Sequence, residues 1–136
     1  MISRTVGQKG EDIAVQYLKK KGYRILDRNF EARIFGLKRG EIDIVAKHKG
    51  VIVFVEVKAL RGSKWFFPED RINLAKKKRL IRMAEYWLAK SNLSLNRKWR
   101  MDIVSVRLGS QPEELEISHF ENAFGDRNMR DLGLTS

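Results

Sequence analysis

The stretch GEIDIVAKHKGVIVFVEVK, residues 40–58, predicts a β-hairpin. We expect one strand at residues 41–46, a turn at residues 48–50 and a second strand at residues 51–57. The second strand, VIVFVEV, is too apolar for the edge of a sheet. It should therefore be a central strand that is covered on both faces.

Apolar residues at helical spacing predict two helices, one before this hairpin and one after it. The first covers residues 10–21 and stops at Gly22, and the second covers residues 73–90. Further strands are expected in segments that read as extended, which are residues 23–30, residues 31–35 before a turn at 36–40, residues 101–108 and residues 115–120, with a loop at 61–70. This order predicts an α/β protein with a mixed central β-sheet flanked by helices. We expect a single domain at residues 1–124 and a C-terminal tail at residues 125–136.

Three charged side chains interrupt the apolar hairpin strands. Glu56 and Lys58 are two residues apart, so their side chains face the same side of the second strand. Asp43 lies between two isoleucines on the first strand, where a buried charge is costly. Two carboxylates offer the hard oxygen ligands that Mg²⁺ or Mn²⁺ prefers, and Lys58 can hold a phosphate oxygen or orient the attacking water. The pattern predicts a metal-dependent site that cleaves phosphodiesters. The alternative is a buried ion pair of Glu56 with Lys58, and of Asp43 with an arginine.

The charge balance favours an anionic partner. The chain has 136 residues, with 28 Lys and Arg against 17 Asp and Glu, a net charge of +11 and a pI of about 10.1. Nucleic acid is the commonest such partner, although a basic surface tuned for solubility would have the same composition. The absence of cysteine excludes disulfides, cysteine-based zinc sites and a cysteine nucleophile. Residues 1–10 contain no apolar signal core, and no run approaches the ~20 apolar residues of a membrane span. We therefore expect a cytoplasmic protein that does not associate with membranes.

Residues 40–45, GEIDIV, followed by residues 53–58, VFVEVK, resemble the D…ExK signature of the PD-(D/E)XK nuclease superfamily. Within it, the chain resembles the YraN-like family of small bacterial proteins over residues 7 to about 106. The remaining positions of that family's pattern are Gly10-Glu11, Ala14, Leu18, Gly22-Tyr23, Ile25-Leu26, Arg28-Asn29, Arg61, Lys76, Ala84, Trp87-Leu88 and Arg100-Met101-Asp102. The resemblance implies a restriction-endonuclease-like core with a metal at a forked strand pair, and phosphodiester hydrolysis.

The expected metal site comprises Asp43, Glu56 and the backbone carbonyl of Val57, with Lys58 as the catalytic cation. Archaeal Holliday junction resolvases have a similar arrangement, including a glutamate in the first helix. By that resemblance Glu11 is a further acidic catalytic residue. The alternative is a first-turn glutamate that interacts with the helix dipole.

Basic residues around the second helix are the candidates for nucleic-acid binding. Lys76 shares the core-facing side of that helix, so it should reach a carboxylate or a phosphate. The other candidates are Arg61, Lys64, Lys77 and Arg79. The aromatic residues 65–67 could stack on unpaired bases or form a small core under their loop. Phe67 stands where the family usually has glycine, which could change substrate access.

Two functions from different classes fit these features. The first is a metal-dependent endonuclease that acts on branched or damaged DNA, single-stranded DNA included. The alternative is a non-catalytic nucleic-acid-binding module that retains the nuclease fold. Charge does not separate DNA from RNA as the partner, and a homodimer remains open. His48, His119, Arg100 and Asp102 are expected to be structural or surface residues.

Overall fold

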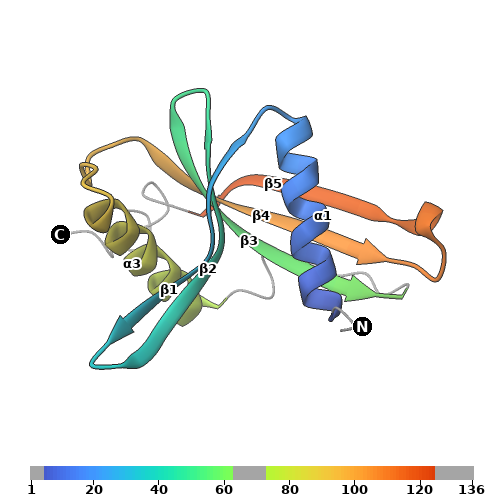
Figure 1. Ribbon diagram of the computed structural model, residues 1–136, viewed down its shortest axis with the longest axis horizontal. Coiled ribbons are helices and arrows are strands. Elements are labelled where there is room, and N and C mark those ends of the chain that lie inside the picture. The colour runs from blue at the N-terminus through green and yellow to red at the C-terminus, as the bar shows by residue number, and fades with distance from the viewer. Residues whose placement is uncertain (1–4, 63–72, 125–136) are drawn as a thin grey trace.

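The computed structural model describes residues 5–62 and 73–124. Its elements, in chain order, are α1 (Val6–Lys20), β1 (Arg24–Ile34), β2 (Leu37–His48), β3 (Val51–Arg61), α3 (Leu74–Lys90), β4 (Trp99–Leu108), a short 3₁₀ helix (Pro112–Glu114) and β5 (Glu116–Phe124). The strands form one sheet in the order β1-β2-β3-β4-β5, antiparallel throughout except for the parallel pair β3 and β4 (Figure 1). The expected mixed α/β sheet is confirmed, and β3 is its central strand.

The two helices cover opposite faces of this sheet (Figure 1). On one face α1 packs on β3 and β4, around a core that includes Leu18, Val53 and Val55. On the other face α3 packs on β2, around a core that includes Phe54 and Trp87. Consecutive residues of β3 therefore enter different cores, which explains why this strand is apolar along both faces.

The turn between β1 and β2 is shorter than the sequence predicts. Ile34 pairs with Leu37, so only Phe35 and Gly36 connect the strands. Both have positive φ angles, 53° and 78°, which suit a two-residue hairpin turn. The predicted turn at residues 36–40 is wrong, because the second strand already begins at Leu37. One continuous strand, β1, likewise replaces the two predicted at residues 23–30 and 31–35.

The first helix begins four residues earlier than predicted. The Thr5 side chain accepts a hydrogen bond from the Gln8 backbone N–H, and the Gln8 side chain accepts one from the Thr5 N–H. This capping box satisfies two backbone donors that the helix itself leaves free. It extends the helix by four residues, which include Gly7, a residue of low helical propensity.

The strands β2 and β3 separate at a fork. From the Lys49–Gly50 turn they pair as far as Ile44 and Val55, and then diverge (Figure 1). The alternation of side chains between the two faces of β2 also breaks here. Ile42 and Ile44 are two residues apart and should face the same side, yet Ile42 lies in the α3 core and Ile44 in the α1 core. Asp43 lies between them, at the opening of the fork.

Asp102 organises a separate polar network on the α1 side of the sheet. It is fully buried and accepts hydrogen bonds from Arg100 Nε at 3.0 Å and the Asn122 N–H at 2.9 Å. His119 Nε2 lies 2.7 Å from Asp102 Oδ2, and the Tyr17 hydroxyl lies 3.1 Å from His119 Nδ1. This network ties α1, β4 and β5 together, in agreement with the structural role expected for these residues.

Several expectations lie outside the described residues. They are the predicted DNA contact Lys64, the aromatic residues 65–67 and the C-terminal tail at residues 125–136. Among the helices that the structure describes, none is long and apolar enough to cross a membrane.

Candidate active site

Asp43 is held in the fork by the backbone of the neighbouring strand. Its Oδ2 accepts a hydrogen bond from the Val57 N–H, with 2.8 Å between the two heavy atoms. The carboxylate therefore takes the place of a backbone partner where the β2–β3 ladder has ended. The N–H and C=O of one strand residue point toward the same neighbouring strand. The Val57 carbonyl consequently also faces the fork, beside Asp43.

Two further carboxylates meet Asp43 at this point. Glu11 on α1, Glu41 on β2 and Asp43 each offer one carboxylate oxygen, and these oxygens all lie within 4.8 Å of one another. Glu41 and Asp43 are two residues apart on β2, whereas Glu11 lies on α1, which precedes both strands of the hairpin in the chain. The fold thus brings together carboxylates from two elements. We call Glu11, Glu41 and Asp43 the acidic cluster.

A close contact between α1 and β3 brings Glu11 to the cluster. Gly10 is buried, and a Cβ atom there would lie only 2.5 Å from the Cβ of Ala59. Real Cβ atoms do not approach so closely, so a larger residue at this position would push α1 away from the sheet. Gly10 therefore sets the distance at which its neighbour Glu11 reaches the fork.

Asn29 bridges two members of the acidic cluster. It lies on β1 with φ at 52°, a left-handed conformation in which asparagine is enriched. With its amide nitrogen turned toward the cluster, it donates to Glu11 Oε1 at 2.7 Å and to Glu41 Oε1 at 3.1 Å. Arg28 Nη2 lies 3.9 Å from the same Glu11 oxygen. Asn29 thus links the two glutamates, and neither Asn29 nor Arg28 is among the main influences on the pKa of Asp43.

Glu56 lies on the α3 side of the fork between two lysines. Its Oε1 is 3.8 Å from Lys58 Nζ and 3.9 Å from Lys76 Nζ. Lys58 follows on the same strand, and Lys76 comes from the first turns of α3. The predicted approach of Lys76 to a carboxylate is confirmed. A pocket of about 290 Å³ is lined by Asp43, Glu56 and Lys76 together with Glu41 and residues of α3.

The electrostatics of the cluster are unfavourable without a cation. Burial and the adjacent Glu56 raise the pKa of Asp43 to about 7, although the Val57 N–H acts in the opposite direction. Burial and the adjacent Asp43 also raise the pKa of Glu11. Burial and the neighbouring Lys76 lower the pKa of Lys58. The carboxylates therefore repel one another at neutral pH, and no arginine is among the main influences on Asp43.

This donor set suits a divalent cation with hard oxygen ligands. Carboxylate oxygens within 4.8 Å of one another can surround an ion that binds oxygen at about 2.0–2.6 Å. The Val57 carbonyl and the Glu56 carboxylate add oxygen donors at the edge of the same group. A cation would also relieve the repulsion that raises the pKa of Asp43. The residues therefore fit Mg²⁺ or Mn²⁺.

The ion-pair alternative describes this arrangement less well. Glu56 does approach Lys58, but at 3.8 Å, beyond hydrogen-bonding distance. For Asp43 the nearest donor among the described residues is a backbone N–H, and the strongest charge acting on it is another carboxylate. Buried ion pairs stabilise a fold only when geometry is excellent, which is not the case here.

The sequence patterns assign no role to Glu41 of the acidic cluster or to Asn29, which bridges the cluster. Glu41 precedes Asp43 by two residues, so strand periodicity could have placed both carboxylates on one side. Asn29 belongs to the family pattern but has no chemistry of its own, so only its contacts reveal it.

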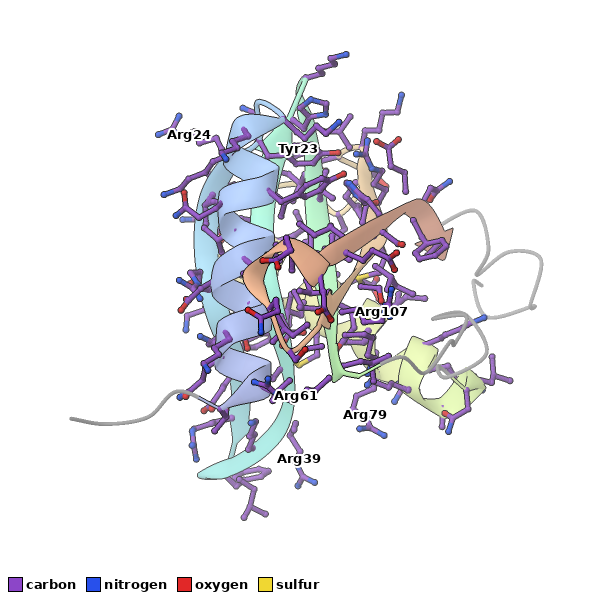
Figure 2. The ribbon with its side chains drawn as sticks, turned by 90° about the vertical axis from the view of Figure 1, so that its right-hand side faces the viewer. Tyr23, Arg24, Arg39, Arg61, Arg79 and Arg107 are labelled. Carbon is purple, nitrogen blue, oxygen red and sulfur yellow. The ribbon has the colours of Figure 1, made fainter. Side chains whose placement is uncertain are left out.

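The predicted nucleic-acid contacts occupy different surroundings. Arg79 lines the pocket of Asp43 and Glu56, whereas Arg61 lines another cavity beside Lys9. In Figure 2, Arg39, Arg61 and Arg79 lie toward one end of the molecule, and Arg24 lies toward the opposite end. Lys77 is half-buried on α3. The basic side chains that line the acidic pocket are Lys38, Lys76 and Arg79, which come from the β1–β2 hairpin and α3.

Comparison with known sequences places relatives across most of the chain. A family described as "Uncharacterised protein family UPF0102" matches residues 10–106. A UPF0102 protein of Caldicellulosiruptor saccharolyticus is 41% identical over 124 residues, which cover 91% of this chain and 100% of the relative. UPF0102 proteins of Caldanaerobacter subterraneus and Persephonella marina are 40% and 39% identical, covering 89% and 91% of this chain and 95% and 97% of the relatives. The matched region contains every member of the acidic cluster.

Proposed function

The chain belongs to the UPF0102 family, and from this premise and its acidic cluster we propose that it is a metal-dependent DNA endonuclease. It would hydrolyse phosphodiester bonds with Mg²⁺ or Mn²⁺ as cofactor. Branched or damaged DNA is the proposed substrate class, by resemblance to the Holliday junction resolvases.

The observation that carries this proposal is the convergence of Glu11, Glu41 and Asp43 within 4.8 Å at the end of a strand ladder. Glu56 adds a further carboxylate on the neighbouring strand. Such charge is costly in a small fold, and it raises the pKa of Asp43 to about 7. A binding module that used only its positive surface would gain nothing from this cost.

Each residue has a role that follows from its position. Glu11, Glu41, Asp43 and the Val57 carbonyl would hold the cation, with Glu56 as a further oxygen donor at its edge. When bound, the cation lowers the pKa of a water and neutralises charge on the phosphate. Lys58 and Lys76 flank Glu56 and would stabilise negative charge on the phosphoryl oxygens. Because burial lowers the pKa of Lys58, this lysine can also exchange a proton with the attacking water. Asn29 positions the two glutamates.

The first test combines metal binding with cleavage. Calorimetric titration of Mn²⁺ into the purified protein should show binding that Asp43→Asn abolishes and Glu41→Gln weakens by about tenfold or more. The matched control is Glu113→Gln, which removes the same charge from an exposed carboxylate in the short 3₁₀ helix. Unchanged affinity in Asp43→Asn would overturn the site.

The second test incubates the protein with Mg²⁺ or Mn²⁺ and single-stranded, duplex, flap and four-way DNA. Cleavage that requires metal and Asp43 supports the proposal. If wild-type protein binds these DNAs but cuts none of them, the non-catalytic DNA-binding function replaces the nuclease.

A further inference from the structure

A second cavity adjoins the acidic pocket. It encloses about 450 Å³ between the β1–β2 hairpin and α3. Its walls include the buried Ala32 and Met83 and the partly exposed Tyr86. Arg79 and Met83 line both this cavity and the acidic pocket, so the two are adjacent compartments. A volume of this size is within the range of pockets that hold small organic groups.

Three arginines surround the second cavity. Arg39 lies on the hairpin, and Arg79 and Arg82 are three residues apart on α3, so they share one face of the helix. All three are exposed. Within residues 5–62 and 73–124, no carboxylate lies within ion-pair distance of any of them. Their guanidinium groups are therefore not engaged in ion pairs within these residues and can contact whatever enters the cavity.

Tyr86 provides a flat apolar surface at the same place. Its ring lies 5.9 Å from that of Phe30, centroid to centroid, at an interplanar angle of 32°. Phe30 is buried and supports the tyrosine from β1, yet 42% of the Tyr86 surface remains exposed. A ring held from below and open to the cavity can stack on another flat group.

We propose that this cavity takes an unpaired base of the DNA whose adjoining phosphodiester lies at the acidic cluster. A base has the flat apolar faces that Tyr86 and Met83 accept, and its flanking phosphates match the three arginines. A base inside a duplex is stacked on both sides, so only one that has left the stack could enter between the hairpin and α3. The inference rests on the proposed nuclease function and restricts its substrates to DNA with an unpaired nucleotide beside the cut.

The test compares three fluorescently labelled DNAs that differ at one position. The first is fully paired, the second carries one unpaired adenine, and the third carries an unpaired abasic sugar instead. Affinities are measured by anisotropy in EDTA, so that cleavage does not occur. Wild-type protein should bind the unpaired adenine about fivefold to a hundredfold more tightly than the abasic DNA, as expected for stacking on an aromatic side chain.

Tyr86→Ala should reduce this preference to nearly one, whereas Tyr86→Phe should retain it because the ring remains. Tyr86 is half-exposed, so both variants should fold, and thermal melts of the two would verify this. Arg82→Ala should weaken binding of the unpaired DNA more than Arg24→Ala, which removes the same charge at the opposite end of the molecule (Figure 2).

Equal wild-type affinity for the adenine and abasic DNAs would overturn the inference and leave the cavity to another ligand. An unchanged preference in Tyr86→Ala would overturn it as well. If the protein cuts paired DNA and DNA with an unpaired base equally well, this inference is refuted and the proposed nuclease function stands. One that prefers the unpaired base but never cuts supports the cavity and refutes the nuclease.

Discussion

Replacing Asp43 with asparagine should stabilise the metal-free protein at about pH 8. The pKa of Asp43 rises from 3.8 to about 7 in the fold, because burial and Glu56 disfavour its charged form. A shift of about three units corresponds to roughly 4 kcal/mol at about 1.4 kcal/mol per unit. Asparagine removes the charge and keeps an oxygen that can accept the Val57 N–H. We expect a gain of about 2–4 kcal/mol, or roughly 10 °C in Tm.

The pH dependence has a definite sign. The folded state holds the Asp43 proton more tightly than the unfolded chain, so the contribution of Asp43 to wild-type stability is full below pH 3.8 and falls as pH rises toward about 7. The variant does not titrate at this position. Its advantage should therefore be absent near pH 3.8, grow up to about pH 7 and stay constant above it. Urea denaturation across this range, in the presence of a chelator, measures the difference.

A second buried aspartate provides the control. Hydrogen bonds from His119, Arg100 and the Asn122 N–H lower the pKa of Asp102 against the effect of its burial. Asp102→Asn should therefore destabilise the protein at the pH at which Asp43→Asn stabilises it.

Addition of Mn²⁺ should then cancel most or all of the advantage of Asp43→Asn over wild type. Wild type gains about 3 kcal/mol at a hundredfold excess of metal over Kd, and the variant gains nothing. If Asp43→Asn were less stable than wild type without metal at about pH 8, the argument from carboxylate repulsion would be refuted.

Three further predictions test the site from other directions. Gly10→Ala should lower the free energy of unfolding by about 1–3 kcal/mol and weaken Mn²⁺ binding, because its Cβ would lie 2.5 Å from that of Ala59. Gly7→Ala is the control and should stabilise α1, because its Cβ would meet only Thr5 Oγ1 at 3.8 Å. Equal melting temperatures of the two variants would contradict this. Lys58→Ala should slow cleavage by about a hundredfold or more with DNA affinity nearly unchanged, and wild-type single-turnover rates in this variant would exclude a catalytic role. Affinity for duplex DNA should fall as the salt concentration rises, because the protein has a net charge of +11. The slope of log K against log salt should be about −0.9 for each phosphate contacted, and a flat response would argue against phosphate binding.

The local elements follow from the sequence where one signal dominates. The run VIVFVEV has no polar face, so it had to be a central strand, and it is. The turn before β2 was misplaced because Gly36 and Gly40 both favour turns, while only the pairing of Ile34 with Leu37 selects between them. The start of α1 was missed because the apolar residues at helical spacing begin at Ile13, well after the Thr5–Gln8 capping box.

For the charged residues, too, the sequence decided the local position of each residue and the tertiary structure decided its contacts. The sequence by itself determined that Asp43, Glu56 and Lys58 occupy apolar strands, because each of them has an apolar residue on both sides in the chain. Only the tertiary structure decided which carboxylates meet. Glu11 reaches Asp43 because Gly10 lets α1 approach β3 closely. The pairing of β2 with β3 ends at Ile44, which leaves the neighbouring Asp43 free to face the fork. Such contacts join residues far apart in the chain, and they depend on packing distances that no local pattern encodes.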